Sequence, residues 1–111
     1  MKLISNAIKK AVIEMLLLYL LSQKDMYGYE LVQTLKTNSD GKFTLMEGSM
    51  YPILYRLADQ GDISCYEKLV GRRQKRVYYH LEEPGKKHLE EMKQEYTDYI
   101  ALIDMLMHIT F

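Results

Sequence analysis

The chain has 111 residues, of which 48% are hydrophobic and 27% are charged. This length suits a single domain, and the composition excludes a disordered, collagen-like or multidomain protein. Fifteen Lys and Arg residues balance fifteen Asp and Glu residues, so no global charge attracts the chain to nucleic acid or to acidic lipid.

The charge is nevertheless unevenly distributed. Residues 62–80 have five basic and two acidic side chains, whereas residues 81–111 have three basic and seven acidic ones. The single Cys65 cannot form an internal disulfide, which favours a reducing, cytoplasmic location. The apolar run over residues 15–21 is far shorter than the roughly 20 residues that span a bilayer, so no membrane association is expected.

The first predicted element is a helix over residues 5–23, for which Ser5 is a suitable N-cap. Its apolar residues begin at helical spacing and then cover most of the circumference: Ile8, Ala11, Val12, Met15, Leu16, Leu18, Tyr19 and Leu21. A helix that is apolar on nearly every side has to be buried on nearly every side. Either a partner subunit covers one of its faces, or the helix lies at the centre of the core.

A short second helix follows and ends at the polar cluster of residues 37–41. Residues 42–45 then alternate between polar and apolar side chains, with Phe43 and Leu45 on one side. This alternation predicts a very short strand.

The next predicted element is a helix over residues 49–61, with Ser49 as N-cap and Pro52 in the first turn, where its missing N–H costs nothing. Ile53, Leu54 and Leu57 supply its core face. Five residues remain as candidates for its outward side: Ser49, Met50, Tyr51, Tyr55 and Arg56.

Residues 63–81 change to a period of two and predict a β-hairpin. Its turn carries four cations within five residues, namely Arg72, Arg73, Lys75 and Arg76. From Pro84 onward a final helix reaches residue 111 and shows a heptad pattern, which is typical of helix association. The heptad positions are Leu89, Met92, Tyr96, Tyr99, Ile103 and Leu106.

This order of elements predicts a mainly α fold with a small β-hairpin, a winged helix-turn-helix followed by a long C-terminal dimerisation helix. Residues 1–82 form the winged-helix domain, with residues 49–61 as recognition helix and residues 63–81 as wing. Residues 83–111 form the dimerisation segment. A recognition helix reads DNA in the major groove, and a basic wing adds phosphate contacts.

Other chemistry has little support in the sequence. His80, His88 and His108 lack the spacing of metal ligands, and one Cys does not complete a zinc site. No phosphate loop, nucleophile elbow or catalytic carboxylate pair is present. We therefore expect no enzymatic activity, no metal and no cofactor.

Five segments together resemble the PadR family of bacterial transcriptional regulators. They are residues 27–31 (YGYEL), 48–57 (GSMYPILYRL), 61–63 (GDI), 71–73 (GRR) and 77–81 (VYYHL). The resemblance covers nearly the whole chain, and the single C-terminal helix is similar to that of the smaller subfamily. Two departures stand out: family members usually have a Thr after Leu81, where this chain has Glu82, and the chain has no Trp with which to sandwich a flat ligand.

The resemblance implies a homodimeric repressor that binds a pseudo-palindromic operator in double-stranded DNA and is released by a small aromatic or hydrophobic effector. Tyr27 and Lys42 are then expected to contact the DNA backbone beside the helix and wing residues named above. Dimerisation is expected through the first and last helices, at Ile8, Val12, Leu89, Met92, Tyr96, Tyr99, Ile103 and Leu106. Met15, Tyr19, Tyr96 and Tyr99 are candidates for an effector pocket.

Two alternatives stay open at this point. The winged-helix dimer acts as a protein–protein interaction module without DNA binding, or the helices form a carrier for a small ligand. Charge reversal at Arg72 and Arg73 separates the three, because only a DNA-binding protein would lose salt-dependent duplex affinity.

Overall fold

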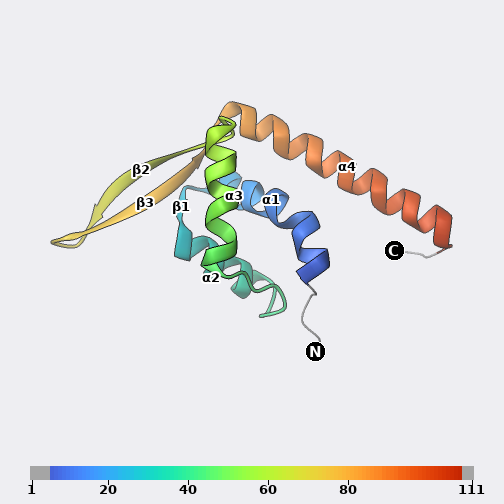
Figure 1. Cartoon of the computed structure of the whole chain (residues 1–111), viewed down its shortest axis with the longest axis horizontal. Coiled ribbons are helices and arrows are strands. Elements are labelled where there is room, and N and C mark those ends of the chain that lie inside the picture. Colours follow the sequence, from blue (N-terminus) through green and yellow to red (C-terminus); the bar gives the residue numbers. More distant parts are fainter. Residues whose placement is uncertain (1–5, 109–111) are drawn as a thin grey trace.

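The computed structural model describes residues 6–108, and its elements are arranged as in Figure 1. They are α1 (Asn6–Gln23), β1 (Met26–Tyr27), α2 (Gly28–Asn38), α3 (Glu47–Asp59), β2 (Ile63–Val70), β3 (Gln74–Leu81) and α4 (Glu83–Met107). This confirms the predicted mainly helical winged-helix fold with a long C-terminal helix. The Ser5 cap and residues 109–111 of the predicted last helix lie outside the described residues. Among residues 6–108, no helix is both long and apolar enough to cross a membrane.

The three strands form one antiparallel sheet in the order β1-β3-β2. β2 and β3 are the predicted hairpin, which projects from the helices in Figure 1. Lys68 pairs with Arg76, and Tyr66 pairs with Tyr78, which also pairs with Tyr27 of β1. Because strand side chains alternate between faces, these five residues share one face of the sheet.

The strand predicted at residues 42–45 is wrong, since the third strand of the sheet is Met26–Tyr27. In this segment, side chains already form hydrogen bonds with the backbone N–H and C=O groups that would otherwise pair with a neighbouring strand. The Phe43 N–H donates to the hydroxyl of Ser39 at 2.8 Å, and the Thr44 carbonyl accepts from the Lys9 ammonium at 2.6 Å. Phe43 and Leu45 are both buried. The alternation of polar and apolar residues over 42–45 therefore reflects a loop that packs two side chains into the core.

The core lies where α1, α2 and α3 meet. Its fully buried side chains are Leu17 and Leu18 of α1, Leu31 of α2, and Met50, Leu54 and Leu57 of α3. Complete burial of such a side chain stabilises the fold by about 1.5–3 kcal/mol. α1 therefore contributes one face to the core, while Ile8 and Tyr19 stay 62% and 47% exposed.

The predicted recognition helix begins earlier in the structure than the sequence indicates. α3 runs from Glu47 to Asp59, its N-cap is Met46, and Ser49 lies within the first turn and not at the cap. Pro52 falls inside the helix. The acidic Glu47 in the first turn favours this earlier start through its interaction with the helix dipole.

The start of α4 is fixed against the turn that follows α3. The Glu82 N–H donates to the Asp62 carbonyl at 2.9 Å, and His88 Nδ1 lies 2.8 Å from the Asp62 carboxylate. A Cβ on Gly85 would overlap that same Asp62 carbonyl oxygen. α4 then extends away from the other helices, as Figure 1 shows. Its start at Glu83 coincides with the predicted domain boundary, and the division into two domains stays a prediction.

Candidate nucleic-acid interface

One face of the sheet carries interleaved aromatic rings and cations. We call Tyr27, Tyr66, Lys68, Arg76 and Tyr78 the wing face. The Tyr66 and Tyr78 rings stack at a centroid distance of 5.7 Å, and Tyr27 meets Tyr78 edge-on at 5.5 Å. The Arg76 guanidinium lies 4.3 Å from the Tyr27 ring centroid, and the Lys68 ammonium lies 5.4 Å from that of Tyr78. Both cations are therefore held over aromatic rings in the orientation that cation–π contacts favour.

The four cations predicted for the wing fall into three environments. Arg76 belongs to the wing face, whereas Arg72 and Arg73 are exposed at the tip, where Gly71 adopts a positive φ of 70°. Lys75 lies on the opposite face, with its ammonium 3.6 Å from the Glu67 carboxylate. Alternation along β3 separates Lys75 from Arg76, so the two cations cannot contact the same ligand surface.

The candidate residues of α3 are not equivalent. Ser49 and Tyr55 are exposed, and the Tyr55 ring stacks on that of Tyr51 at 6.1 Å. Met50 has no exposed surface, so the prediction that it faces outward is wrong. Arg56 is exposed, but its guanidinium pairs with Glu14 of α1 at 3.1 Å.

A hollow of about 290 Å³ lies between α3 and β3, where Arg76 of the wing face is joined by Val77 and Tyr79 of the opposite face. Its lining includes Tyr27 and Gly28 at the start of α2, Tyr51 and Tyr55 of α3, and Arg76 of β3. A Cβ on Gly28 would overlap the Tyr51 hydroxyl, so glycine is required for this close approach. The hollow therefore places phenol rings and one guanidinium between the recognition helix and the wing.

Two tyrosines of this region are held neutral by their surroundings. Burial, helped by the neighbouring Tyr51 and Tyr55, raises the pKa of Tyr79 to about 12. Burial and the nearby Glu47 carboxylate, to which the Tyr51 hydroxyl donates at 3.3 Å, also raise the pKa of Tyr51. Tyr79 is only 4% exposed and belongs to the core, whereas Tyr51 is half-buried and its hydroxyl is already bonded to Glu47.

The last predicted DNA contact, Lys42, lies in the loop between α2 and α3 and is half-buried. It is not among the residues that line the hollow. The arrangement thus unites Tyr27, Tyr51, Tyr55 and Arg76 and leaves Lys42, Lys75 and Arg56 outside the hollow.

A second concave region lies between α1 and α4, as a groove of about 370 Å³. Three of the four predicted effector residues line it, namely Met15, Tyr96 and Tyr99. Tyr19 is not among them and lines a separate hollow with Leu16 and Phe43. The predicted dimer residues Ile8, Val12, Met92 and Ile103 also line the groove.

The two remaining predicted dimer residues lie in opposite environments. Leu89 is only 4% exposed because it packs in the core of its own chain, so the prediction that it contacts a partner is wrong. Leu106 is 68% exposed near the end of α4.

Three residues of the wing face escaped the sequence analysis. Tyr66, Lys68 and Tyr78 lie in the predicted strands, and their even numbering places them with Arg76 on one face. The alternation of side chains along the two strands is therefore enough to predict that these residues lie on the same face as Arg76. The contribution of Tyr27 to this face had no such signal, because a two-residue strand has no periodicity. Among the described residues, no group of three His, Cys, Asp or Glu side chains is placed to hold a metal ion.

Comparison with known proteins connects this arrangement to transcriptional regulators. Residues 17–91 match the family described as "Transcriptional regulator PadR-like family". A protein of Lysinibacillus sphaericus is 30% identical over 95 residues, which are 86% of this chain and 87% of that protein. The transcriptional regulator YqjI of Escherichia coli (strain K12) is 31% identical over 83 residues, and these are 75% of this chain but 38% of YqjI.

A solved structure also shares the fold. The crystal structure of a PadR-like transcriptional regulator from Bacillus cereus superposes with a TM-score of 0.78 at 32% sequence identity. The match covers 95% of this chain and 100% of the Bacillus cereus chain, so it includes the wing and the long C-terminal helix.

Proposed function

The chain belongs to the PadR-like family of transcriptional regulators, and on this basis we propose that it is a homodimeric repressor that binds duplex DNA. The recognition helix α3 enters the major groove, and the wing contacts the phosphates beside it. A small aromatic or hydrophobic effector releases the dimer from its operator.

The observation that carries this proposal is the concentration of cations and phenol groups on one surface of a chain with no net charge. Lys68 and Arg76 on the wing face, with Arg72 and Arg73 at the tip, supply four cations per chain. The hollow with Tyr51 lies between them and the exposed side of α3. Cations position a protein on the phosphate backbone, while hydroxyl groups also reach base edges.

Exposed apolar side chains on α4 support dimerisation. Tyr99, Met105 and Leu106 are 61%, 65% and 68% exposed. Large apolar side chains that remain exposed together on one helix favour an interaction site there. A two-fold symmetric dimer presents two α3 helices to successive major grooves about 34 Å apart, which requires an operator with matching symmetry.

The groove between α1 and α4 supports release by an effector. Its size lies near the lower end of the roughly 300–1,000 Å³ range of small-molecule sites, and its lining is mostly apolar. A ligand wedged there favours one separation of the two α3 helices, while the operator favours another. The two binding events are then linked through the dimer geometry.

A selection experiment tests the proposal. The protein is mixed with sheared DNA from its source organism at about 0.15 M salt, near the physiological ionic strength, and the retained fragments are sequenced. We expect enrichment of one or a few sites with two-fold symmetry, and loss of all retention when Arg72 and Arg73 are both changed to Glu. Retention of no fragment, or of unselected fragments, by the wild-type protein contradicts sequence-specific regulation and favours a protein partner for the wing.

A further inference from the structure

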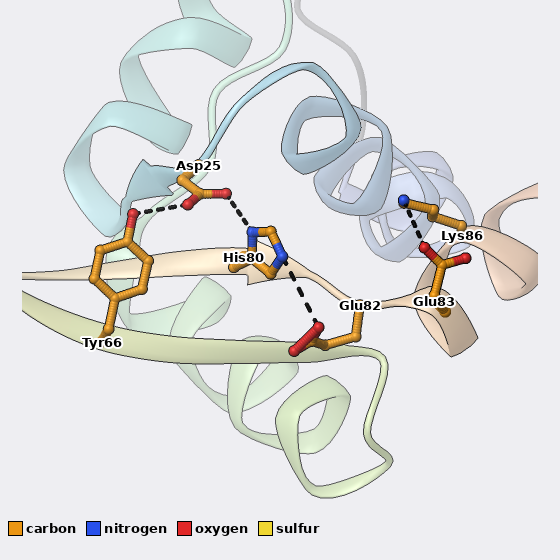
Figure 2. Close-up of polar contacts among 6 residues, drawn as sticks. All are labelled: Asp25, Tyr66, His80, Glu82, Glu83 and Lys86. Atoms are coloured by element: carbon orange, nitrogen blue, oxygen red, sulfur yellow. Dashed lines mark hydrogen bonds and ion pairs between the residues drawn. The ribbon is translucent and has the colours of Figure 1, made fainter.

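A hydrogen-bonded cluster fixes the base of the wing to the loop between α1 and β1 (Figure 2). The Tyr66 hydroxyl of β2 donates to Oδ2 of Asp25 at 2.7 Å, and Nδ1 of His80 on β3 lies 2.7 Å from Oδ1 of the same carboxylate. Nε2 of His80 faces Oε1 of Glu82 at 3.8 Å. Asp25 therefore contacts both strands of the wing, although it belongs to neither.

The ionisation state of Asp25 determines whether Asp25 or His80 carries the proton of the hydrogen bond between them. Partial burial acts against ionisation of Asp25, but the hydrogen bonds from Tyr66 and His80 outweigh it and lower the pKa of the carboxyl group. Asp25 is thus a carboxylate near neutral pH and only accepts hydrogen bonds. His80 Nδ1 must carry the proton, and a neutral His80 directs the lone pair of Nε2 toward Glu82.

Protonation of His80 changes the contact with Glu82. The protonated ring gains an Nε2–H that is able to donate to the Glu82 carboxylate, and it pairs with Asp25 as a full ion pair. Asp25 and Glu82 are the charged groups that face the ring, and Ser64 is its neighbour on β2. Lys24, beside Asp25 in sequence, is already paired with Glu30 at 2.8 Å.

The cluster connects directly to the cations of the wing face. The Tyr66 ring, held by Asp25 through its hydroxyl, stacks on Tyr78. Lys68 lies over the Tyr78 ring, and Arg76 belongs to the same sheet face. β2 pairs with β3 alone in the sheet, so the bond between Tyr66 and Asp25 is a second anchor for this outer strand. Fixing Tyr66 therefore fixes the Tyr78 ring on which Lys68 rests, and Tyr78 in turn contacts Tyr27, over which Arg76 lies.

We propose that Asp25, His80 and Tyr66 are positioning residues for the wing, and that protonation of His80 strengthens this anchor and so increases duplex affinity as the pH falls. The inference rests on the proposed DNA binding. Their proposed role is to hold the wing face in place, and the phosphate contacts are assigned to Lys68 and Arg76. The three residues act by limiting the orientations that the wing face takes before it meets the phosphates, which reduces the entropy lost on binding.

The test compares duplex dissociation constants at about pH 6 and pH 8, on either side of the ordinary histidine range, at one fixed ionic strength. For the wild-type protein we expect affinity about three- to tenfold higher at the lower pH, as one partly exposed charge-assisted hydrogen bond allows. His80→Gln keeps an uncharged donor toward Asp25 but does not titrate, and we expect it to lose this gain. His88→Gln is the matched control, because His88 of α4 bonds to the Asp62 carboxylate and not to Asp25, Tyr66 or His80, and it should keep the gain.

Tyr66→Phe separates positioning from simple charge attraction. It removes only the hydroxyl that joins Asp25 to β2 and leaves His80 free to titrate. Positioning predicts that Tyr66→Phe loses most of the pH-dependent gain, whereas attraction of phosphate by a charged His80 predicts that the full gain persists. Thermal melting of each variant at both pH values confirms that the compared proteins are folded.

The outcomes distinguish the two proposals. A persistent gain in Tyr66→Phe or in His80→Gln, or no gain in the wild-type protein, overturns the positioning role while duplex binding stands. Absence of salt-dependent duplex binding by the wild-type protein at both pH values overturns the proposed function, and the inference falls with it.

Discussion

Removal of the two wing-face cations should change the salt dependence of DNA binding by a calculable amount. Lys68 and Arg76 together with Arg72 and Arg73 give four cations per chain that the proposal assigns to phosphates. A dimer then has about eight, and the slope of log affinity against log salt is about −7 at roughly 0.9 per neutralised phosphate. Affinity falls about 10⁴-fold between 50 and 200 mM salt on this slope.

The double substitution Lys68→Ala with Arg76→Ala halves the number of cations. The expected slope is then about −3.6, and the loss of affinity over the same salt range is about 10²-fold. Fluorescence anisotropy of a labelled duplex, measured at four or more salt concentrations, gives this slope directly. The slope is the useful quantity because a variant that is merely misfolded in part lowers the affinity at every salt concentration alike.

Lys75→Ala is the matched control for this experiment. Lys75 neighbours Arg76 in sequence but lies on the opposite face of the hairpin beside Glu67. Its removal should leave the slope unchanged. An equal reduction in slope by Lys75→Ala and Arg76→Ala would refute the assignment of the wing face as the phosphate-binding surface.

Three further substitutions test other parts of the structure. Gly85→Ala places a methyl group on the backbone carbonyl of Asp62 and should lower the free energy of unfolding by about 1–3 kcal/mol, measured by urea denaturation; an unchanged midpoint would contradict the close packing of α4 there. Tyr99→Glu puts a charge on the exposed stripe of α4 and should convert a sedimenting dimer into a 13.1 kDa monomer, whereas an intact dimer would show that another surface mediates association. The pKa of Asp25 is lower in the folded chain than in the unfolded one. Its carboxylate therefore stabilises the fold fully at pH values above the unfolded pKa of about 3.9. This stabilisation is lost as the pH falls through the pKa of the folded chain. Asp25→Asn should therefore reduce stability at pH 7 but flatten its decline in acid, and parallel acid-denaturation curves for the two proteins would disprove this role.

The recognition helix shows how far the sequence leads. Apolar spacing predicted a helix in this part of the chain, and α3 is there. Met50 is nevertheless buried, because Met50, Leu54 and Leu57 follow one another at i, i+4 and i+7 and form the core stripe of the helix. Ile53 lies at the edge of that stripe and is only partly buried. The spacing of Met50, Leu54 and Leu57 contains this answer, whereas the predicted core face combines Leu54 and Leu57 with Ile53.

The third strand of the sheet, β1, is a feature that the sequence pattern does not predict. Alternation predicted the hairpin and its basic turn, since eight residues in each strand give a clear period. The third strand has two residues and no period of its own. Its pairing depends on contacts that are distant in sequence, such as Asp25 with His80 and Tyr27 with Tyr78. Such contacts become visible only when the hairpin has been placed against the helices.

One helix connects the groove to the proposed DNA-reading surface. Met15 of α1 lines the groove, while two polar side chains of the same helix hold both ends of α3. Lys9 donates to Thr44 in the loop before α3, and Glu14 pairs with Arg56 near its end. Lys9 is only 8% exposed, so breaking its bond would leave a buried ammonium without that acceptor. A ligand that turns α1 in the groove must therefore carry α3 with it or break these contacts, and either result alters how the recognition helix meets DNA.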